Sequence, residues 1–475
     1  MDASTVLSNR IGLIVAPAGC GKTQLIVETL KQPTTKPILV LTHTTAGVAA
    51  LQSRLINSNV PRSNYHLATI AGWAISLVLK YPTISGINRT FLTKPNYPQL
   101  HTAASQLIAH RHIDRIIEAT YSRILVDEYQ DCSFSQHNLI TQLSRILPTT
   151  VLGDPMQSIF GFDQKDPLPC WESVVQSQFP LIGHLNTPWR WTNVNRDDLG
   201  SWVLSTRNIL ASGQGIDITH GGPNVSWIKL SGNHQQDFDT QVKYQYELRK
   251  SVPDDETILI IGHPISYKSR HKFAQMTNGI GVVESVEMKD VTAIFTWIDK
   301  FSGDKILEKA LDTATDVMTG VGKSTLLKRV ETIMAGRGKK IPTTIEITAA
   351  AVKNDPCPAN IYTLFNELAL SDQTKVFRHA ALKVITEALL LCSTTDLTAI
   401  DSVIRVLEKR RHSGDKRVPN RAIGSTLLLK GLEADHVIIL DGNCDKMDSK
   451  NLYVALSRGA KSITVFAKSP ILGNV

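Results

Sequence analysis

Short apolar segments alternate with amphipathic segments over the first 200 residues of the chain. The apolar segments have the length of strands and lie at 11–16, 37–42, 123–126, 149–153 and 182–185. Segments between them, such as 23–31 and 45–57, repeat their apolar residues at helical spacing. Alternation of strands and helices is typical of a parallel sheet that is covered on both faces. The sequence therefore predicts an α/β domain at its N-terminus.

A second set of apolar strands begins near residue 224 and is interrupted by a long helical region. Its strands are predicted at 225–230, 257–262, 425–429, 436–441 and 462–467. Between residues 286 and 421 the spacing is mostly helical, as at 306–319, 324–335 and 376–393. In the first domain, a stretch rich in Pro, Thr and Asn at 81–98 precedes a helical segment at 103–120. These patterns predict two α/β domains with a helical insertion in each.

Composition and charge narrow the class of protein. The 475 residues are 42% hydrophobic and 20% charged, as in a globular protein of several domains. No apolar run reaches the ~18 residues of a membrane span, and the first ten residues lack the features of a signal peptide. The six cysteines form no CxxC pair, which argues against zinc and disulfides and favours a reducing, cytoplasmic location. A net charge of +8 is compatible with a polyanionic partner.

A phosphate-binding loop is predicted at residues 16–23, with the sequence APAGCGKT. It follows a predicted strand, opens a predicted helix and begins with a small residue, Ala16. Gly19 and Gly21 allow backbone amides to turn around phosphate oxygens, and the helix N-terminus adds positive charge. In this pattern Lys22 neutralises the β- and γ-phosphates and Thr23 binds Mg²⁺.

Two acidic residues, Asp127 and Glu128, follow the apolar strand predicted at 123–126. Two carboxylates at the end of a buried strand are costly unless they have a role. Together with the upstream loop, they indicate that Asp127 holds Mg²⁺ and that Glu128 polarises the attacking water. The sequence therefore predicts hydrolysis of a nucleoside triphosphate.

Seven ordered motifs resemble those of the UvrD/Rep branch of superfamily-1 helicases. Besides the loop they are LTHTTAGVAALQSRL at 41–55, DEYQD at 127–131, GDPMQSIFGF at 153–162, LNTPWR at 185–190, LLKGLEADHVIIL at 428–440 and LYVALSRGAKSITVF at 452–466. The resemblance implies an α/β fold of two RecA-like parallel-sheet domains. It assigns 1–80 and 119–200 to domain 1A, 81–118 to insertion 1B, 201–285 and 422–475 to domain 2A, and 286–421 to the helical insertion 2B.

The resemblance also implies roles for residues beyond the loop. Gln157 senses the γ-phosphate, Trp189 stacks on the base, and Glu433 contacts the ribose. Arg190 and Arg458 stabilise the transferring phosphate, with Arg458 reaching it from the second domain when the domains close. The nucleotide-binding residues so implied are Ala16, Gly19, Cys20, Gly21, Lys22, Thr23, Gln24, Trp189, Arg190, Glu433 and Arg458, and those for Mg²⁺ are Thr23 and Asp127.

The motifs likewise imply contacts with single-stranded DNA. Phe162 matches the aromatic residue that stacks on a base, Phe160 lies beside it, and Thr42, His43 and Thr44 sit where the second motif touches the strand. Core packing is the alternative for the two phenylalanines. The chain departs from the pattern at these positions, since Phe162-Asp163 stands where Trp-Arg is usual. A Gln-containing motif upstream of the loop is also absent, so the strictness of adenine selection stays open.

The motifs together imply an ATP-dependent DNA helicase or ATPase with ATP and Mg²⁺ as cofactors. Its expected activity is ATP hydrolysis stimulated by single-stranded DNA or a tailed duplex, coupled to 3′–5′ movement, with no membrane association. The small first insertion resembles that of the stand-alone UvrD-like subunit of the Gabija antiphage system, which acts with an ATP-dependent nuclease partner. The alternative function is therefore an ATPase that senses DNA ends or nucleotide and regulates such a nuclease in antiviral defence.

Overall fold

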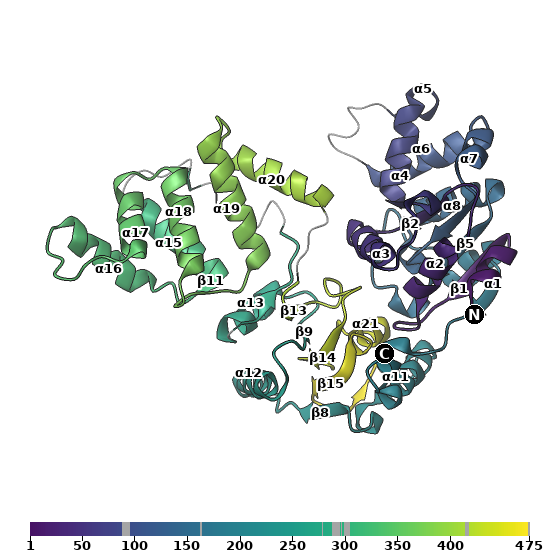
Figure 1. Ribbon diagram of the computed structural model, residues 1–475. Helices are drawn as coiled ribbons and strands as arrows, with labels where there is room; N and C mark the ends of the chain where they lie inside the picture. The colour runs from purple at the N-terminus through teal and green to yellow at the C-terminus, as the bar shows by residue number, and fades with distance from the viewer. Residues whose placement is uncertain are drawn as a thin grey trace. The chain divides into compact units, whose positions relative to one another are not determined.

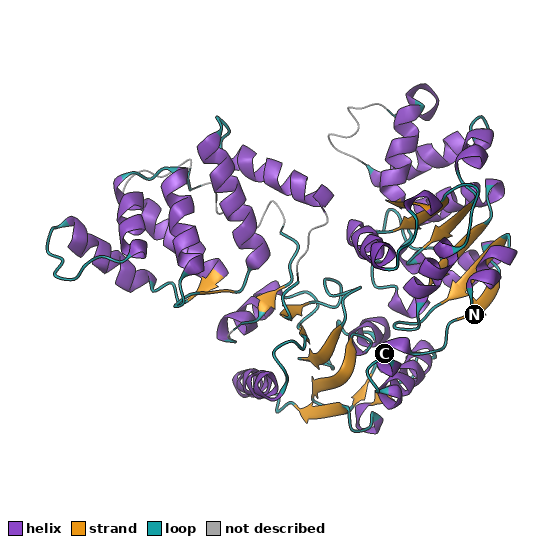
Figure 2. Ribbon diagram, viewed as in Figure 1, coloured by secondary structure: helices purple, strands orange, loops and turns teal. Residues whose placement is uncertain are grey.

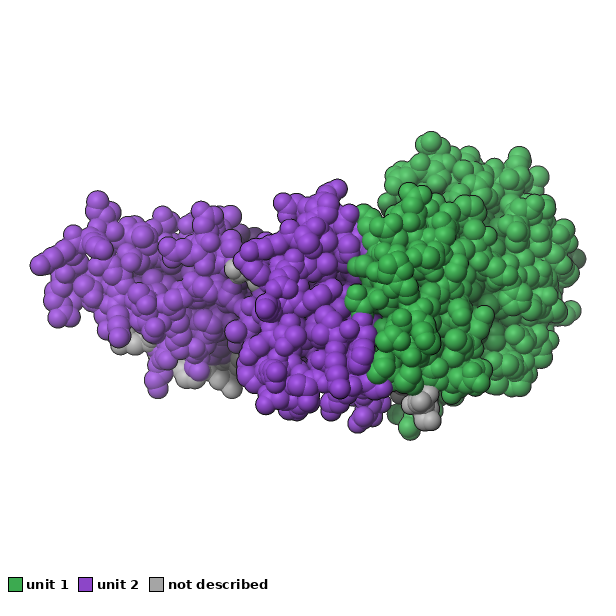
Figure 3. All heavy atoms as spheres, turned by 90° about the horizontal axis from the view of Figure 1, so that it is seen from below, with its two compact units in different colours: residues 1–226, 447–463, 470–475 green, residues 227–446, 464–469 purple. Residues whose placement is uncertain are grey.

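The computed structural model describes residues 1–87, 96–161, 164–277, 279–286, 295, 297–298, 305–413 and 418–473. The chain divides into two compact units (Figure 3). The first unit consists of Met1–Ser226, Met447–Ile463 and Pro470–Val475, and the second of Trp227–Lys446 and Thr464–Ser469. Among the described residues, no helix combines the length and the apolar character that a bilayer span requires.

The first unit is built on a six-stranded sheet with the order β3-β2-β4-β5-β1-β6. All of its neighbouring strands pair in parallel, as predicted. The strands are β1 (Ile11–Val15), β2 (Ile38–Thr42), β3 (Tyr65–Thr69), β4 (Arg123–Val126), β5 (Thr149–Gly153) and β6 (Leu181–His184). Because the strands are parallel, the segments that follow β1, β4 and β5 all begin at the same edge of the sheet.

Helices cover both faces of this sheet (Figures 1 and 2). Alternate residues of one strand enter different cores: Ile14 packs with α1 to α3, whereas Leu13 packs with α4, α6 and α8. This two-sided burial explains why inner strands such as β1 and β2 consist almost entirely of apolar residues. The helices of the unit are α1 (Ala3–Ser8), α2 (Lys22–Lys31), α3 (Thr45–Asn57), α4 (Ile70–Lys80), α5 (Pro82–Ser85), α6 (Tyr97–Ala109), α7 (Asp114–Thr120), α8 (Phe134–Ile146), α9 (Gln176–Gln178), α10 (Trp189–Thr192), α11 (Asp197–Ala211) and α21 (Ser449–Leu456).

The prediction of one helix over 103–120 was wrong. The chain forms two helices there, and α6 ends at Ala109. Arg111 adopts a left-handed conformation with φ 62°, which cannot continue a right-handed helix. A two-stranded antiparallel sheet, β7 (Ile216–Asp217) with β16 (Ile471–Leu472), completes the unit.

The other six-stranded sheet has the order β10-β13-β9-β14-β15-β8. Its neighbouring pairs β10–β13, β13–β9 and β9–β14 are parallel. The strands are β8 (Val225–Lys229), β9 (Ile258–Ile261), β10 (Gly281–Val282), β13 (Arg421–Gly424), β14 (Ala434–Ile439) and β15 (Gly459–Ala467), and the accompanying helices are α12 (His234–Ser251) and α13 (Tyr267–Met276). The two sheets confirm the predicted α/β fold of two RecA-like domains.

The strand predicted at 425–429 was wrong, because the strand of this region is β13, which ends at Gly424. Residues 425–429 form a turn in which the Leu429 amide donates to the Ser425 carbonyl at 3.0 Å. Local closure of this turn uses backbone groups that a strand would offer to its neighbours.

Between β10 and β13 lies a group of helices with its own apolar core, as the helical spacing predicted. Figure 1 shows these helices in green. They are α15 (Lys305–Val317), α16 (Lys323–Met334), α17 (Thr344–Asn354), α18 (Pro358–Leu370), α19 (His379–Thr394) and α20 (Ala399–Ser413), with the short strands β11 (Met318–Thr319) and β12 (Lys375–Val376) pairing between them.

One segment of this helical group is anchored in the second sheet. Phe377, between β12 and α19, is buried in the core of that sheet, and its carbonyl accepts from the Val282 amide at 2.7 Å. Next to it, Arg378 donates to Glu284 through Nε at 3.0 Å. Burial opposes ionisation of Glu284, but bonds from His271 and Arg378 hold the pKa of this carboxyl below its usual range. The helical group is thus attached at a third point besides its two chain connections.

Substitution of Phe365 tests whether the helical group has a core that is independent of the first sheet. Its side chain is 1% exposed on α18, and replacement by Ala should cost about 3–5 kcal/mol of unfolding free energy. Because its core is separate, hydrogen exchange should rise in α15 to α20 and stay unchanged in β1, β4 and β5. Phe365→Leu, which keeps most of the volume, is the control. An equal rise of exchange in both units would contradict separate cores.

Candidate active site

The predicted phosphate loop joins β1 to α2. Gly19 and Gly21 have φ values of 72° and 86°, in the left-handed region. A Cβ on Gly19 would lie 2.8 Å from Cζ3 of Trp191, and one on Gly21 would lie 3.0 Å from Cδ1 of Trp189. Both the backbone and the packing therefore require glycine. A glycine-rich turn that leads directly into a helix N-terminus is suited to bind phosphate.

Lys22, the first residue of α2, faces the two carboxylates predicted at the end of β4. Its Nζ lies 2.5 Å from Oε1 of Glu128 and 3.4 Å from Oδ1 of Asp127. Burial alone would lower the pKa of Lys22, but the two carboxylates outweigh it and raise the pKa, so the ammonium stays charged. Burial in turn raises the pKa of Asp127, with Lys22 opposing and Glu128 adding to the shift.

Charge balance at this point suits a divalent cation. One ammonium faces two carboxylates, which leaves an excess negative charge in a largely buried place. Thr23, the second residue of α2, adds a hydroxyl at the same end of the helix. Carboxylate and hydroxyl oxygens are the hard ligands that Mg²⁺ prefers, and Mg²⁺ at nucleotide sites needs few of them. The residues present therefore fit the predicted Mg²⁺.

Glu128 is held in an unusual backbone conformation. Its φ and ψ are 53° and 42°, a left-handed geometry that costs a non-glycine residue about 1–3 kcal/mol. Its Oε2 accepts a hydrogen bond from Nε2 of Gln130 at 2.5 Å, while Oε1 faces Lys22. Backbone and side chain together fix the direction of this carboxylate. Such strain is concentrated at functional sites.

A third carboxylate, Asp154 after β5, organises the neighbouring polar groups. Its side chain is fully buried and accepts from Nε and Nη2 of Arg207 at 3.0 and 2.7 Å. Its Oδ2 accepts from Nε2 of Gln157 at 3.2 Å, and its backbone amide donates to Oε1 of Gln130 at 3.0 Å. Oε1 of Gln157 in turn accepts from Nη2 of Arg458 at 3.2 Å. A continuous hydrogen-bonded chain therefore links Lys22 to Arg458.

Residues around α21 contact the phosphate loop and the segment after β6. The Ala18 amide donates to the Tyr453 hydroxyl at 3.0 Å, and Nε1 of Trp191 donates to the Gly459 carbonyl at 2.8 Å. The Arg190 guanidinium bonds the Ser457 carbonyl. Burial and the charge of Asp154 raise the pKa of Cys20 to about 12, so this loop thiol stays protonated. The compact unit that holds the phosphate loop thus also holds Arg458.

The remaining residues predicted to bind nucleotide differ in their placement. The Trp189 indole lies against Gly21 and is 51% exposed, so it offers a ring beside the loop. The Gln24 side chain is exposed and donates to Glu28 at 2.7 Å within α2. Ala16 is buried at the start of the loop. Glu433 is exposed just before β14 in the second unit.

The residues predicted to contact DNA follow β2 and the loop after β5. The rings of His43 and Phe160 are 5.6 Å apart, and Phe160 is partly buried. Thr42 is 2% exposed, and the Thr44 hydroxyl caps α3 by accepting from the Gly47 amide at 3.0 Å. These two threonines therefore have structural roles in the described chain. Phe162 lies outside the described residues.

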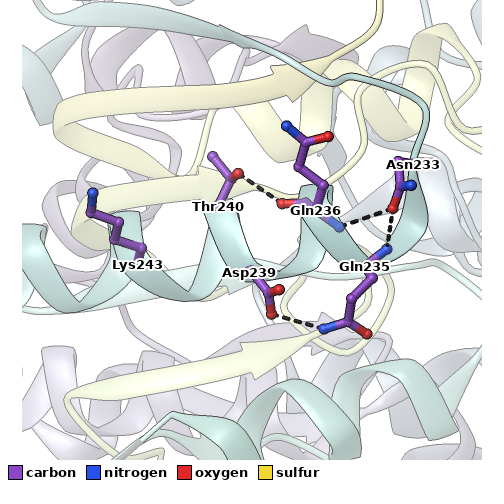
Figure 4. Close-up of a pocket in the computed structure, with 6 residues that line it drawn as sticks. All are labelled: Asn233, Gln235, Gln236, Asp239, Thr240 and Lys243. Carbon is purple, nitrogen blue, oxygen red and sulfur yellow. Dashed lines mark hydrogen bonds between the residues drawn. The ribbon is translucent and has the colours of Figure 1, made fainter.

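An open groove along the first turns of α12 has a volume of about 570 Å³ (Figure 4). The residues that line it are Asn233, Gln235, Gln236, Asp239, Thr240 and Lys243. The hydrogen bonds drawn there join residues of that helix to one another and to Asn233, the residue that caps its N-terminus. None of the predicted site residues lines this groove, so it is separate from the candidate active site.

Sequence reasoning missed Gln130, Asp154 and Arg207 in the polar chain, and Tyr453 beside the phosphate loop. Gln130 and Asp154 stand inside the motifs DEYQD and GDPMQ, so the motifs themselves could have revealed them. Tyr453 likewise stands inside the last motif. Arg207 lies 53 residues after its partner Asp154 and outside every motif. No pattern in the sequence signals that pairing.

Residues 2–163 match the family described as AAA domain. Similar proteins include two ATP-dependent helicase/nuclease subunits, one from Oenococcus oeni that is 37% identical over 65 residues and one from Leuconostoc mesenteroides that is 36% identical over 72 residues. The matched stretches cover 14% and 15% of this chain and 6% of each relative. The domain and the relatives support the predicted ATP-dependent enzyme of the helicase class and its likeness to UvrD/Rep-like helicases.

Proposed function

We propose that the protein is a DNA-stimulated ATPase that couples ATP hydrolysis to 3′–5′ movement on single-stranded DNA. The polar chain from Lys22 through Glu128, Asp154 and Gln157 to Arg458 is the observation that supports this proposal most strongly. It unites a phosphate loop, a candidate base and a candidate arginine for the transition state. The relatives named as ATP-dependent helicase/nuclease subunits support the choice of a DNA motor.

In this proposal the loop at 16–23 binds the triphosphate, and Lys22 pairs with its β- and γ-phosphates. Lys22 and Glu128 form an ion pair at 2.5 Å. A phosphate that binds the Lys22 ammonium replaces Glu128 in this pair and so releases the carboxylate. Glu128 then orients the attacking water and accepts its proton. Mg²⁺ bound by Thr23 and Asp127 would neutralise phosphate charge.

Further side chains complete the proposed chemistry. Gln157 contacts the γ-phosphate, while Arg190 and Arg458 stabilise the charge that develops on it. Trp189 stacks on the base, and Glu433 from the second RecA-like domain contacts the ribose.

The proposed path of single-stranded DNA follows the ends of β2 and β5. In this proposal Thr42, His43 and Thr44 form the segment beside the DNA backbone, and buried Thr42 and the helix cap Thr44 maintain the shape of that segment. Phe160 and Phe162 supply rings for base stacking. The His43–Phe160 ring contact joins the two segments. Stacking on an aromatic ring tolerates any base, as a motor on DNA requires.

A second candidate function is control of a partner nuclease, with little unwinding. The relatives favour it, because they are named as helicase/nuclease subunits and are far longer than their matched stretch. In this case the ATPase would sense DNA ends or nucleotide, as in a Gabija-type antiphage system. The helical group α15 to α20 would offer the partner surface, since the proposed DNA contacts do not involve it.

Lys22→Ala should lower kcat/KM for ATP about 100-fold or more, because it removes the cation for the β- and γ-phosphates. Phosphate release measured against ATP concentration checks this. Lys31→Ala, on the exposed face of the same helix, should behave as the unchanged chain. Circular dichroism of the variant confirms folding, since two carboxylates lose their partner. Unchanged turnover in Lys22→Ala would refute the phosphate site.

Glu128→Gln should keep ATP affinity and lower kcat about 10²–10⁴-fold, because the amide cannot accept the proton of water. Equilibrium nucleotide binding and single-turnover hydrolysis separate the two effects. Glu118→Gln, an exposed position of the same unit, is the control. Turnover retained in Glu128→Gln would exclude this residue as the base.

Single-stranded DNA should raise the ATPase rate, and Phe160→Ala should weaken the DNA activation constant roughly tenfold through lost stacking. Phe134→Ala, an exposed phenylalanine of α8, is the matched control. A tailed duplex then separates the candidates. Unwinding without a partner supports the motor, whereas DNA-stimulated hydrolysis without unwinding favours control of a nuclease. An ATPase rate indifferent to DNA would contradict the proposed motor.

A further inference from the structure

Arg207 forms a largely buried ion pair next to the candidate active site. It projects from α11 toward Asp154, and the side chains of Arg207 and Asp154 are 14% and 0% exposed. Two guanidinium nitrogens, Nε and Nη2, donate to the single oxygen Oδ1 of Asp154. A fully buried carboxylate without such a cation is strongly unfavourable.

The same carboxylate determines the orientation of Gln157. Its Oδ2 accepts from Nε2 of Gln157 at 3.2 Å, so the amide oxygen of Gln157 points the other way. That oxygen accepts from Nη2 of Arg458 at 3.2 Å. A reversed amide would place oxygen against the Asp154 carboxylate and NH₂ against the guanidinium, which are both repulsive. The Asp154 carboxylate thus selects one of the two amide orientations of Gln157.

The backbone amide of Asp154 is also connected, through Gln130, to Glu128, the candidate general base. Its amide donates to Oε1 of Gln130, which leaves Nε2 of Gln130 to donate to Glu128. Hydrogen bonds to Asp154 therefore determine the side-chain orientations of both Gln130 and Gln157. Side chains that are fixed in this way are preorganised for a reacting group.

We propose that Arg207 is a positioning residue for the γ-phosphate end of the nucleotide site. It compensates the buried charge of Asp154 through two hydrogen bonds, and through Asp154 it fixes the amide of Gln157 and the guanidinium of Arg458. Arg207 itself does not touch the nucleotide in this proposal. The inference rests on the proposed function, in which Gln157 and Arg458 contact the γ-phosphate.

Lysine cannot replace Arg207 in this role. The planar guanidinium directs two N–H groups at Oδ1 from one side, whereas an ammonium is a compact and strongly hydrated charge on a flexible stem. Arg207→Lys keeps the charge but loses the double contact. It therefore separates precise positioning from simple charge compensation.

The test compares the unchanged chain with Arg207→Lys in equilibrium titrations of ADP and a non-hydrolysable ATP analogue. The variant should bind ADP within about twofold of the unchanged chain and lose about tenfold of its preference for the analogue. Its kcat should fall by about the same factor, with little change in the KM for ATP. These effects follow from misplacing groups that meet only the γ-phosphate.

Arg123→Lys is the matched control. Arg123 is also a buried arginine of the first unit, but it bonds the carbonyls of Leu7 and Asn9 at the start of β4, away from the strand ends. This variant should lower the melting temperature and leave the nucleotide preference unchanged. A preference lost equally in both variants would show a general structural effect and overturn the proposal.

A double-mutant cycle tests the route through Gln157. If Arg207 acts through this side chain, Arg207→Lys should add nothing to the loss that Gln157→Ala already causes, whereas independent effects would add. Asp154→Asn, which keeps the shape of the side chain, provides a second variant with the same expected loss should Arg207→Lys fold poorly. An analogue preference and a kcat equal to those of the unchanged chain in Arg207→Lys or Asp154→Asn, or additive losses in the cycle, would overturn the proposal.

The titrations also distinguish this proposal from the proposed function. The preference for the ATP analogue over ADP is an equilibrium property, so it tests the positioning role of Arg207 whether or not the chain hydrolyses ATP. Absence of hydrolysis in the unchanged chain would contradict the proposed function alone. Absence of any preference for the ATP analogue in the unchanged chain would overturn the role of Arg207.

Discussion

Neighbouring parallel strands end at one edge of the first sheet, and this constraint places the charged groups of the candidate site. β1 and β4 both pair with β5, so the phosphate loop, Asp127-Glu128 and Asp154 begin side by side. Short connections after these strands are therefore enough to bring the three segments into contact. Lys22 can meet Glu128 at 2.5 Å because the strand pairing has already brought α2 and the end of β4 together.

Two buried charge clusters then divide the site. In the first, Lys22 stands against two carboxylates, an imbalance that suits a bound cation. In the second, Asp154 is matched by Arg207 and leaves no comparable excess. Charges that are buried must be compensated, and the two clusters solve this differently. We interpret the cluster of Lys22, Asp127 and Glu128 as the part of the site that binds ligands. We interpret the Asp154–Arg207 pair as a part that keeps its partners and orients the neighbouring side chains.

The helical group α15 to α20 follows a different logic. It has its own apolar core and so does not depend on either sheet for burial. Yet Phe377 enters the core of the second sheet, and Glu284 pairs with Arg378 beside it. An anchor of this kind limits how freely the helical group can move against that sheet.

Local sequence determined the elements whose chemistry is contained within a few consecutive residues. β4 and β5 occur at the predicted bounds because both are apolar runs buried on two faces. The phosphate loop was predictable because Gly19 and Gly21 mark required left-handed turns. Predictions failed where one local signal competed with another, as at Arg111, just after α6, and at the turn after β13.

Tertiary structure alone decided which distant side chains meet. The loop Ala16–Thr23 and the motif residues were visible as types in order, but their hydrogen bonds were not. Asp154 and Arg207 are 53 residues apart, and no periodicity relates them. The sequence by itself thus determined two α/β domains, the phosphate loop and the two acidic residues, Asp127 and Glu128, that face it. The pairing that orients Gln157 and Arg458 required the folded chain, because burial and geometry, rather than residue type, select the partner of a charge.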